Sequence, residues 1–169
     1  SGRYSNSTNL QSASDCTSVS AGYYAATGSV VQTACAPGTY NAQPQQEACA
    51  QCAAGTFQPL EGNTTCVVCP AGSYCEEAAS AALLCSAGTF RSAPGATSAS
   101  DCAECPAGSA CMTGSTSATA CEPGTIAASA RATVCDACIA GKYQSTSGQA
   151  ACADGLAGSY GLARATSAA

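Results

Sequence analysis

The sequence contains no histidine and no tryptophan, and only 9% of its residues are charged. Without histidine, neither a Ser-His-Asp nor a Cys-His catalytic arrangement can be built. Five basic residues against ten acidic ones leave no basic patch, which argues against nucleic acid or an anionic membrane as a partner. No apolar run reaches the roughly 18 residues of a membrane span. We therefore expect no enzyme activity, no cofactor, no metal site, and no membrane span in this segment.

Large apolar side chains are also scarce. Val, Ile, Leu, Met, Phe and Tyr together supply 24 of the 169 residues, whereas Ala, Gly, Ser and Thr supply 95. Such a composition is typical of disordered chains. The 15 cysteines favour the opposite conclusion, because this content is found in scaffolds where disulfides replace hydrophobic burial. The sequence therefore predicts a small disulfide-rich fold in an oxidising location, extracellular or at the cell surface.

One motif recurs along the whole chain: a glycine followed two residues later by an aromatic side chain. Cys69-Pro70-Ala71-Gly72-Ser73-Tyr74-Cys75 shows it most fully, and eight of the nine aromatic residues occupy this position. Two of the ten units depart from the motif, with Ala110 and Ile126 in the aromatic position. We expect the glycine to form a tight turn or a close backbone contact. The ten glycines are Gly2, Gly22, Gly38, Gly55, Gly72, Gly88, Gly108, Gly124, Gly141 and Gly158.

The chain also contains a second, longer repeat, which spans several copies of the glycine–aromatic motif. Residues 1–83 align with residues 87–169 without a gap and share 31 identities, so the chain contains a tandem duplication with a period of 86 residues. We expect two domains, residues 1–86 and residues 87–169, each a cysteine-rich block of five units.

Units of about 17 residues have room for two short strands and a turn. The sequence predicts β-hairpins with strands of three to five residues, and mostly irregular structure elsewhere. Helix is not expected over most of the chain, although 76–84 could form one or two helical turns.

The duplication also predicts which cysteines are partners. Cys69 and Cys75 are both missing from the second block, and Cys105 and Cys111 are both missing from the first. Cysteines that are lost together are most simply bonded to each other, because losing one alone would leave a free thiol. The retained cysteines lie 14 or 17 residues apart, around one glycine–aromatic unit each. The expected pairs are Cys35–Cys49, Cys52–Cys66, Cys69–Cys75, Cys85–Cys102, Cys105–Cys111, Cys121–Cys135 and Cys138–Cys152.

Cys16 is left without a partner in the chain. Its counterpart Cys102 pairs with Cys85, whose own counterpart would precede Ser1. We expect the partner of Cys16 in preceding sequence or in an adjoining chain, and the alternative is a free thiol. The chain has no initiating methionine or signal peptide, as expected of a mature product or a segment of a longer protein.

Two other interpretations compete for the same cysteines. Cys49-x2-Cys52 and Cys66-x2-Cys69 resemble a four-thiolate zinc site, and the C-x-x-C spacing also occurs in thiol–disulfide exchange proteins. The second block has Gly155 where a fourth zinc ligand would stand, and no βαβ pattern surrounds the C-x-x-C pairs. We therefore favour structural disulfides.

Two sites for N-linked glycans are present, Asn6-Ser7-Thr8 and Asn63-Thr64-Thr65. Both fall in the variable stretches between motifs, where a glycan would point outward. We expect glycans at Asn6 and Asn63 if the protein is secreted. The 39 Ser and Thr residues leave further room for O-linked glycans.

The motifs C-P-A-G-S-Y-C, C-A-E-C-P-A-G-S and C-A-P-G-T-Y resemble the cysteine-rich repeats of the ephrin-receptor-like and tumour-necrosis-factor-receptor-like class. Arrays of such repeats occur in surface and mastigoneme proteins of protists and algae. The resemblance implies an elongated tandem array of disulfide-bonded hairpins, and it carries no fixed activity. Two functional classes remain, and the first is a structural repeat of an extracellular glycosylated filament or surface coat. The alternative is a ligand-binding ectodomain of a cell-surface receptor or adhesin.

The unbroken period and the small number of exposed anchors favour the filament. Both ends of the duplication continue the same register, so the expected partners are further copies of the repeat. These copies would be joined by head-to-tail self-assembly or by continuation within a longer chain.

Overall fold

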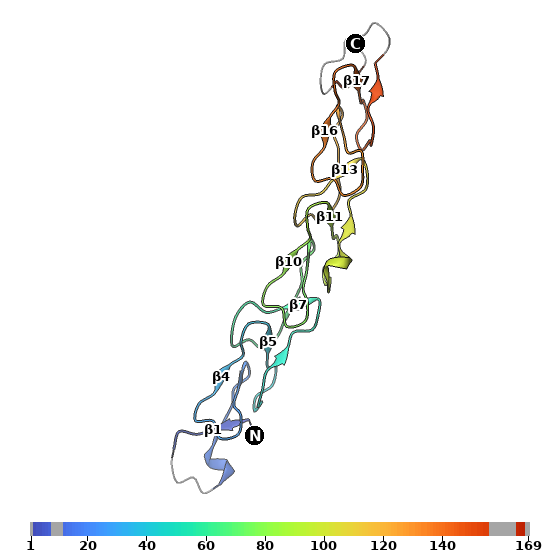
Figure 1. Ribbon diagram of the computed structural model, residues 1–169. Helices are drawn as coiled ribbons and strands as arrows, with labels where there is room; N and C mark the ends of the chain where they lie inside the picture. The colour runs from blue at the N-terminus through green and yellow to red at the C-terminus, as the bar shows by residue number, and fades with distance from the viewer. Residues whose placement is uncertain (1, 8–11, 156–164, 168–169) are drawn as a thin grey trace. The chain divides into compact units, whose positions relative to one another are not determined.

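The structure of the protein is a computed structural model that describes residues 2–7, 12–155 and 165–167. These residues form nine antiparallel hairpins in chain order, and each hairpin is a two-stranded sheet of its own (Figure 1). The predicted series of disulfide-bonded hairpins is therefore confirmed. The strand pairs are β1 (Arg3–Tyr4) with β2 (Thr17–Ser18), β3 (Tyr23–Tyr24) with β4 (Thr33–Ala34), β5 (Thr39–Tyr40) with β6 (Ala50–Gln51), β7 (Thr56–Phe57) with β8 (Val67–Val68), β9 (Ser73–Tyr74) with β10 (Leu83–Leu84), β11 (Thr89–Phe90) with β12 (Ala103–Glu104), β13 (Ser109–Ala110) with β14 (Thr119–Ala120), β15 (Thr125–Ile126) with β16 (Asp136–Ala137), and β17 (Lys142–Tyr143) with β18 (Ala153–Asp154).

Every strand has two residues, so the prediction of three to five was too long. In the β5–β6 hairpin, Thr39 pairs with Gln51 and Tyr40 with Ala50. The ladder gains one more bond, in which the Cys52 N–H donates to the Gly38 carbonyl at 2.9 Å. Pairing stops there because backbone groups of the loop bond to neighbouring hairpins instead of to the opposite strand.

In the eight hairpins from β3–β4 to β17–β18, the motif glycine lies in the turn that leads into the hairpin, while Gly158 lies outside the described residues. At 36–39 the Thr39 N–H donates to the Ala36 carbonyl at 3.0 Å, and Gly38 has a φ of +83°. A positive φ at the third residue of a four-residue turn is the requirement of type II geometry, which glycine meets without strain. Proline at position 37 suits the second residue of the same turn. The motif thus begins each hairpin with a fixed reversal of the chain.

The helical turns expected within 76–84 do not form. Ala78 has a φ of +58°, which no right-handed helix accommodates, and the end of this segment is strand β10. The Ala78 N–H donates at 2.8 Å to the Cys52 carbonyl of an earlier turn. This contact with another hairpin overrides the helix propensity of the alanines and glutamates. In the described residues the helical segments are two single 3-10 turns, Ala13–Asp15 and Ala99–Asp101. Neither approaches the length or apolar character of a membrane-spanning helix.

The chain divides into two compact units. The first comprises Ser1–Pro70, Tyr74–Leu83 and Gly95–Ser98, and the second comprises Ala71–Ser73, Leu84–Pro94 and Ala99–Ala169. Each unit is built from the same kind of hairpin.

The buried interior consists mainly of sulfur. The most buried side chains among the described residues include nine cysteines, at 0 to 1% exposure: Cys35, Cys52, Cys69, Cys75, Cys85, Cys105, Cys111, Cys121 and Cys138. The eight described aromatic residues are all half-buried. These nine cysteines are therefore more deeply buried than the aromatic residues. This arrangement explains how a chain with few large apolar residues has an interior at all.

Candidate functional site

The structure repeats one set of backbone contacts from hairpin to hairpin, and this set is the first candidate for the functional feature. The glycine N–H in the turn before one hairpin donates to the carbonyl that follows the aromatic position in the next hairpin. Gly38 donates in this way to Gln58 at 2.8 Å. The same bond is made by Gly22 to Asn41, Gly55 to Cys75, Gly72 to Arg91, Gly88 to Cys111, Gly108 to Ala127 and Gly124 to Gln144, all at 2.8 to 2.9 Å.

A second bond runs from the same place to the next loop. The residue after the aromatic donates its N–H to a carbonyl in the loop of the following hairpin, as Asn41 does to Asn63 at 3.2 Å. Gln58 and Ala127 make the equivalent bonds to Ala79 and Gln149. Consecutive hairpins are therefore joined by backbone groups, which every residue type carries. The contact survives although the side chains of the loops differ.

A third contact reaches two hairpins further along. In the seven hairpins from β5–β6 to β17–β18, one loop residue has a positive φ, and its carbonyl oxygen lies close to the place where a Cβ would stand on the motif glycine of the hairpin two places earlier. A Cβ atom on Gly38 would lie 2.2 Å from the Ala78 oxygen, and one on Gly22 would lie 2.1 Å from the Gly62 oxygen. Real Cβ atoms do not approach backbone oxygen so closely. The glycine is thus required twice, by its turn and by this close approach.

The disulfides lie along the same series. Their Cα–Cα distances are 5.6 to 5.9 Å, within the usual range for a disulfide. Cys16 is half-buried and forms no disulfide in the described part of the chain. The bonded pairs are Cys35–Cys49, Cys52–Cys66, Cys69–Cys75, Cys85–Cys102, Cys105–Cys111, Cys121–Cys135 and Cys138–Cys152.

The residue after the aromatic has a role that the sequence analysis missed. In several hairpins its side chain donates to the carbonyl directly before the second cysteine, which holds the loop closed beside the disulfide. Gln58 Nε2 donates to Thr65 at 2.6 Å, and Gln144 Nε2 donates to Ala151 at 2.8 Å. Asn41 and Arg91 make the same kind of bond, to Ala48 and Asp101. The signal was present in the sequence, because an amide, a guanidinium or a cysteine recurs three residues after the glycine.

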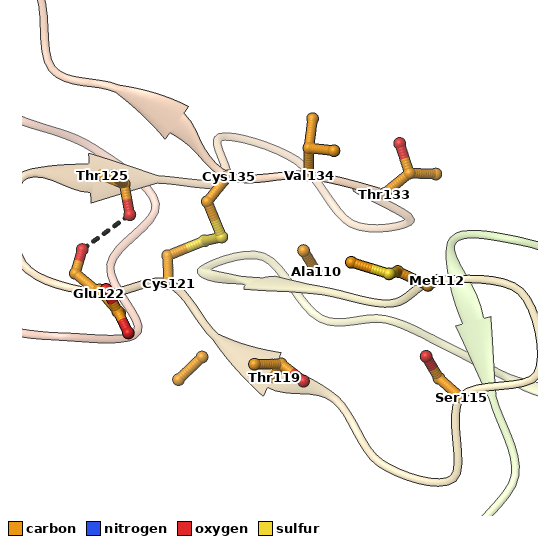
Figure 2. A pocket seen from close by; sticks show the side chains of 11 residues that line it. Ala110, Met112, Ser115, Thr119, Cys121, Glu122, Thr125, Thr133, Val134 and Cys135 are labelled. Carbon is orange, nitrogen blue, oxygen red and sulfur yellow. Dashed lines mark hydrogen bonds between the residues drawn. A yellow bond between two sulfur atoms is a disulfide. The ribbon is translucent and has the colours of Figure 1, made fainter.

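An apolar hollow of about 460 Å³ lies over the β13–β14 and β15–β16 hairpins, within the second compact unit (Figure 2). Ala110 and Met112 lie between Thr133 and Val134 on one side and Ser115 and Thr119 on the other. The Cys121–Cys135 disulfide and Glu122 complete much of the lining. Met112 and Val134 are 73% and 63% exposed, so two large apolar side chains stand open beside a concave surface.

Residues 38–83, from the turn before β5 into β10, match the family model described as tyrosine-protein kinase ephrin type A/B receptor-like. This match and the seven disulfides show which structural class the protein belongs to. The chain is a cysteine-rich repeat protein. No curated protein matches it.

The many disulfides of this cysteine-rich repeat protein, together with the receptor-like family match, fit an extracellular location. In the β3–β4 hairpin, Val19 and Ala25 occupy the positions that hold bonded cysteines in the β13–β14 hairpin. Both are 1% exposed. An apolar pair therefore fills the place of a disulfide without opening the interior.

The repeat protein offers no free thiolates where the zinc pattern was considered. Cys49 and Cys52 are neighbours in sequence, but they belong to different disulfides, with Cys35 and Cys66. Within residues 2–7, 12–155 and 165–167, no group of three or more His, Cys, Asp or Glu side chains could hold a metal ion.

The two glycan positions lie in different surroundings. Asn6 is exposed, while the third residue of its site, Thr8, lies outside the described residues. Asn63 is half-buried in the β7–β8 loop, and its Nδ2 donates to the carbonyls of Leu60 and Glu61 at 3.3 Å. Both asparagines precede a hairpin's second strand, on loops as expected.

Peptide mapping of the unreduced repeat protein should recover each of the seven linkages separately. The sharpest case is the peptide with Cys69 bonded to Cys75, because Cys66 and Cys85 flank it closely in sequence and are bonded elsewhere. Proteolysis at low pH prevents exchange between disulfides during the digest. Recovery of Cys69 bonded to Cys52 or to Cys85 would refute the pairing.

Proposed function

We propose that this cysteine-rich repeat protein is a non-catalytic structural repeat of an extracellular glycosylated filament or surface coat, comparable to a mastigoneme fibre. The observation that carries the proposal is the recurrence of the same backbone contacts between each hairpin and those one and two places along. A fold whose hairpins bond only to near neighbours in the series can be lengthened by adding hairpins. Length is what a filament needs.

The contacts between hairpins are of the head-to-tail kind. In the seven bonds of this kind, a turn glycine donates to the next hairpin along the chain and the carbonyl after the aromatic position accepts, as Gly108 and Ala127 illustrate. The two partners in such a contact present different surfaces, so the contact does not close into a symmetric pair. Repetition of the contact extends the series. Further copies would join it by self-assembly or by continuation within a longer chain.

An extracellular filament also fits the chemistry of the repeat. Seven disulfides persist in an oxidising environment, and they resist local unfolding where no chaperone is present. The side chains facing solvent are mainly Ala, Ser, Thr and Gly, with few charges to attract a partner. The described residues contain two exposed ion pairs, Arg131–Glu104 and Lys142–Asp154. Exposed pairs of this kind add little to stability or specificity.

Electron microscopy of the protein purified from its native source tests the proposal. We expect extended fibres that bind a gold-labelled antibody raised against this chain at regular intervals. The matched control is the same preparation treated with an antibody raised against the reduced and alkylated chain. A compact monomer, by microscopy and by solution scattering, would contradict the filament and favour the receptor or adhesin ectodomain.

Intact mass measurement tests the glycan part of the proposal. We expect N-linked glycans at Asn6 and Asn63, on a surface with too little charge to remain soluble by repulsion alone. Treatment with an amidase that removes N-glycans should convert both residues to aspartate. The treated protein should then be heavier than the unmodified sequence by about one dalton for each residue. Further mass that the amidase leaves in place would be O-linked. A native mass equal to that of the unmodified sequence would contradict this prediction.

A further inference from the structure

The hollow at β13–β14 occurs where the repeat lacks its aromatic residue. Seven other described hairpins have Tyr or Phe at the position of Ala110, and in each the aromatic residue is half-buried. At Ala110 only a methyl group is present, and the surface there is concave instead of covered. The sequence analysis marked this unit as a departure from the motif. The structure places the hollow beside this departure from the motif.

We propose that this hollow binds an aromatic side chain supplied by a partner polypeptide, with a basic residue next to the aromatic one. The partner's ring would take the place that the chain's own Tyr or Phe takes in the other hairpins. Aromatic rings are the side chains that most often anchor protein interfaces in such pockets.

The lining of the hollow suits a ring better than an aliphatic chain. Sulfur atoms approach it from two sides, the thioether of Met112 and the Cys121–Cys135 disulfide. Contacts between divalent sulfur and the edge of an aromatic ring are favourable beyond simple apolar burial. Val134 adds an aliphatic wall, and the hydroxyl groups of Ser115 and Thr119 supply polar partners at the margin for a phenol.

The charge of the lining favours a basic residue next to the aromatic residue of the partner. Glu122 is the charged side chain of the lining, and the lining contains no lysine or arginine. The protein as a whole carries a net charge of −5. A partner segment with lysine or arginine adjacent to the aromatic residue would therefore be attracted, and a segment with an acidic neighbour would be repelled.

A second copy of this chain is a poorer occupant. Its described aromatic residues are each half-buried, so inserting one of them into another chain would first require uncovering it. A separate polypeptide with an exposed aromatic side chain meets no such conflict.

The experiment uses the single methionine of the chain as a reporter. The oxidised 169-residue protein is labelled with ¹³C at the methionine methyl group, which gives one resonance from Met112. The probes are three peptides: acetyl-Gly-Lys-Tyr-Gly-amide, the same peptide with leucine for tyrosine, and the same peptide with glutamate for lysine. We expect the first peptide to move the Met112 methyl resonance upfield, because a ring packed on a methyl group shields it. The leucine peptide should bind more weakly and cause no upfield shift, and the glutamate peptide should bind more weakly than the lysine peptide.

Variants separate insertion into the hollow from general adhesion. Ala110→Tyr gives the hairpin its own ring; we expect the Met112 resonance to be shifted upfield before any peptide is added, and peptide binding to be lost. Val134→Ala should weaken binding roughly tenfold, because it removes two methyl groups from the wall of the hollow. Val30→Ala is the matched control, since Val30 is similarly exposed, at 59%, and lies in another hairpin. An unmoved Met112 resonance, equal binding of the leucine peptide, or equal weakening by the two valine variants would overturn the proposal.

Discussion

Reduction and alkylation of the cysteines should abolish the native structure of the whole chain. A disulfide that closes a loop of about 15 residues contributes roughly 3 kcal/mol in the chain-entropy model. Five of the seven bridges close loops of 14 or 17 residues, and the other two close loops of 6. Their combined contribution is greater than the roughly 5–15 kcal/mol of net stability of an ordinary domain. Strands of two residues and half-buried aromatics cannot replace it.

The near-ultraviolet circular dichroism of the tyrosines and resistance to protease measure this loss. Oxidised protein carried through the same alkylation is the control, and it should keep both properties on heating. The double variant Cys69→Val with Cys75→Ala provides a graded comparison, because Val19 and Ala25 fill the equivalent positions of another hairpin. We expect this variant to lose stability locally and to remain folded elsewhere. A reduced chain that kept its tyrosine signal would show that burial, and not crosslinking, maintains the fold.

Gly38→Ala should destabilise the protein far more than Gly28→Ala. The two glycines have nearly the same backbone conformation, with φ of +83° and +87°. At Gly28 no atom lies within 4 Å of the added Cβ, so the cost is the strain of a left-handed residue, about 1–2 kcal/mol. At Gly38 the Cβ would lie 2.2 Å from the Ala78 oxygen, and the hairpin two places along must move away.

The expected loss for Gly38→Ala is about 4 kcal/mol or more, in the range that marks a specific structural defect. Denaturation of the oxidised proteins in guanidinium chloride, followed by tyrosine fluorescence, gives the comparison. Hydrogen exchange should also show that the Ala78 N–H loses protection in Gly38→Ala and keeps it in Gly28→Ala. Equal destabilisation by the two substitutions would mean that the close approach between hairpins contributes nothing.

The hairpin architecture was predictable because cysteine and glycine positions carry it directly. Cys69 and Cys75 disappear together from the second block, and the structure joins these two. Gly38 was expected at a tight turn or at a close backbone contact, and it serves both purposes. These features depend on covalent chemistry and on a single backbone conformation, so their signal is local in the sequence.

The features that were missed depend on contacts between hairpins. Strand length was overestimated because the loop groups, such as the Ala78 N–H, bond to a hairpin two places away, which no short window of sequence reveals. The same contact prevented the helix expected within 76–84. Ala110 was recognised as unusual, but the hollow beside it needs Val134 from the following hairpin. The loop-closing role of Gln58 was overlooked because a polar residue after a strand looks like ordinary surface.

The spacing of the bridges also determines how the chain would respond to mechanical tension. When the chain is pulled between Cys35 and Cys152, force passes through each disulfide and bypasses the loop that the disulfide closes. Only the segments between bridges can then unravel, namely 50–51, 67–68, 76–84, 103–104, 112–120 and 136–137. Four of these segments are two residues long and are nearly extended already, as strands β6, β8, β12 and β16. The oxidised protein should therefore behave as a tether of low extensibility, and most of its contour length should become available only when a reductant opens the bridges.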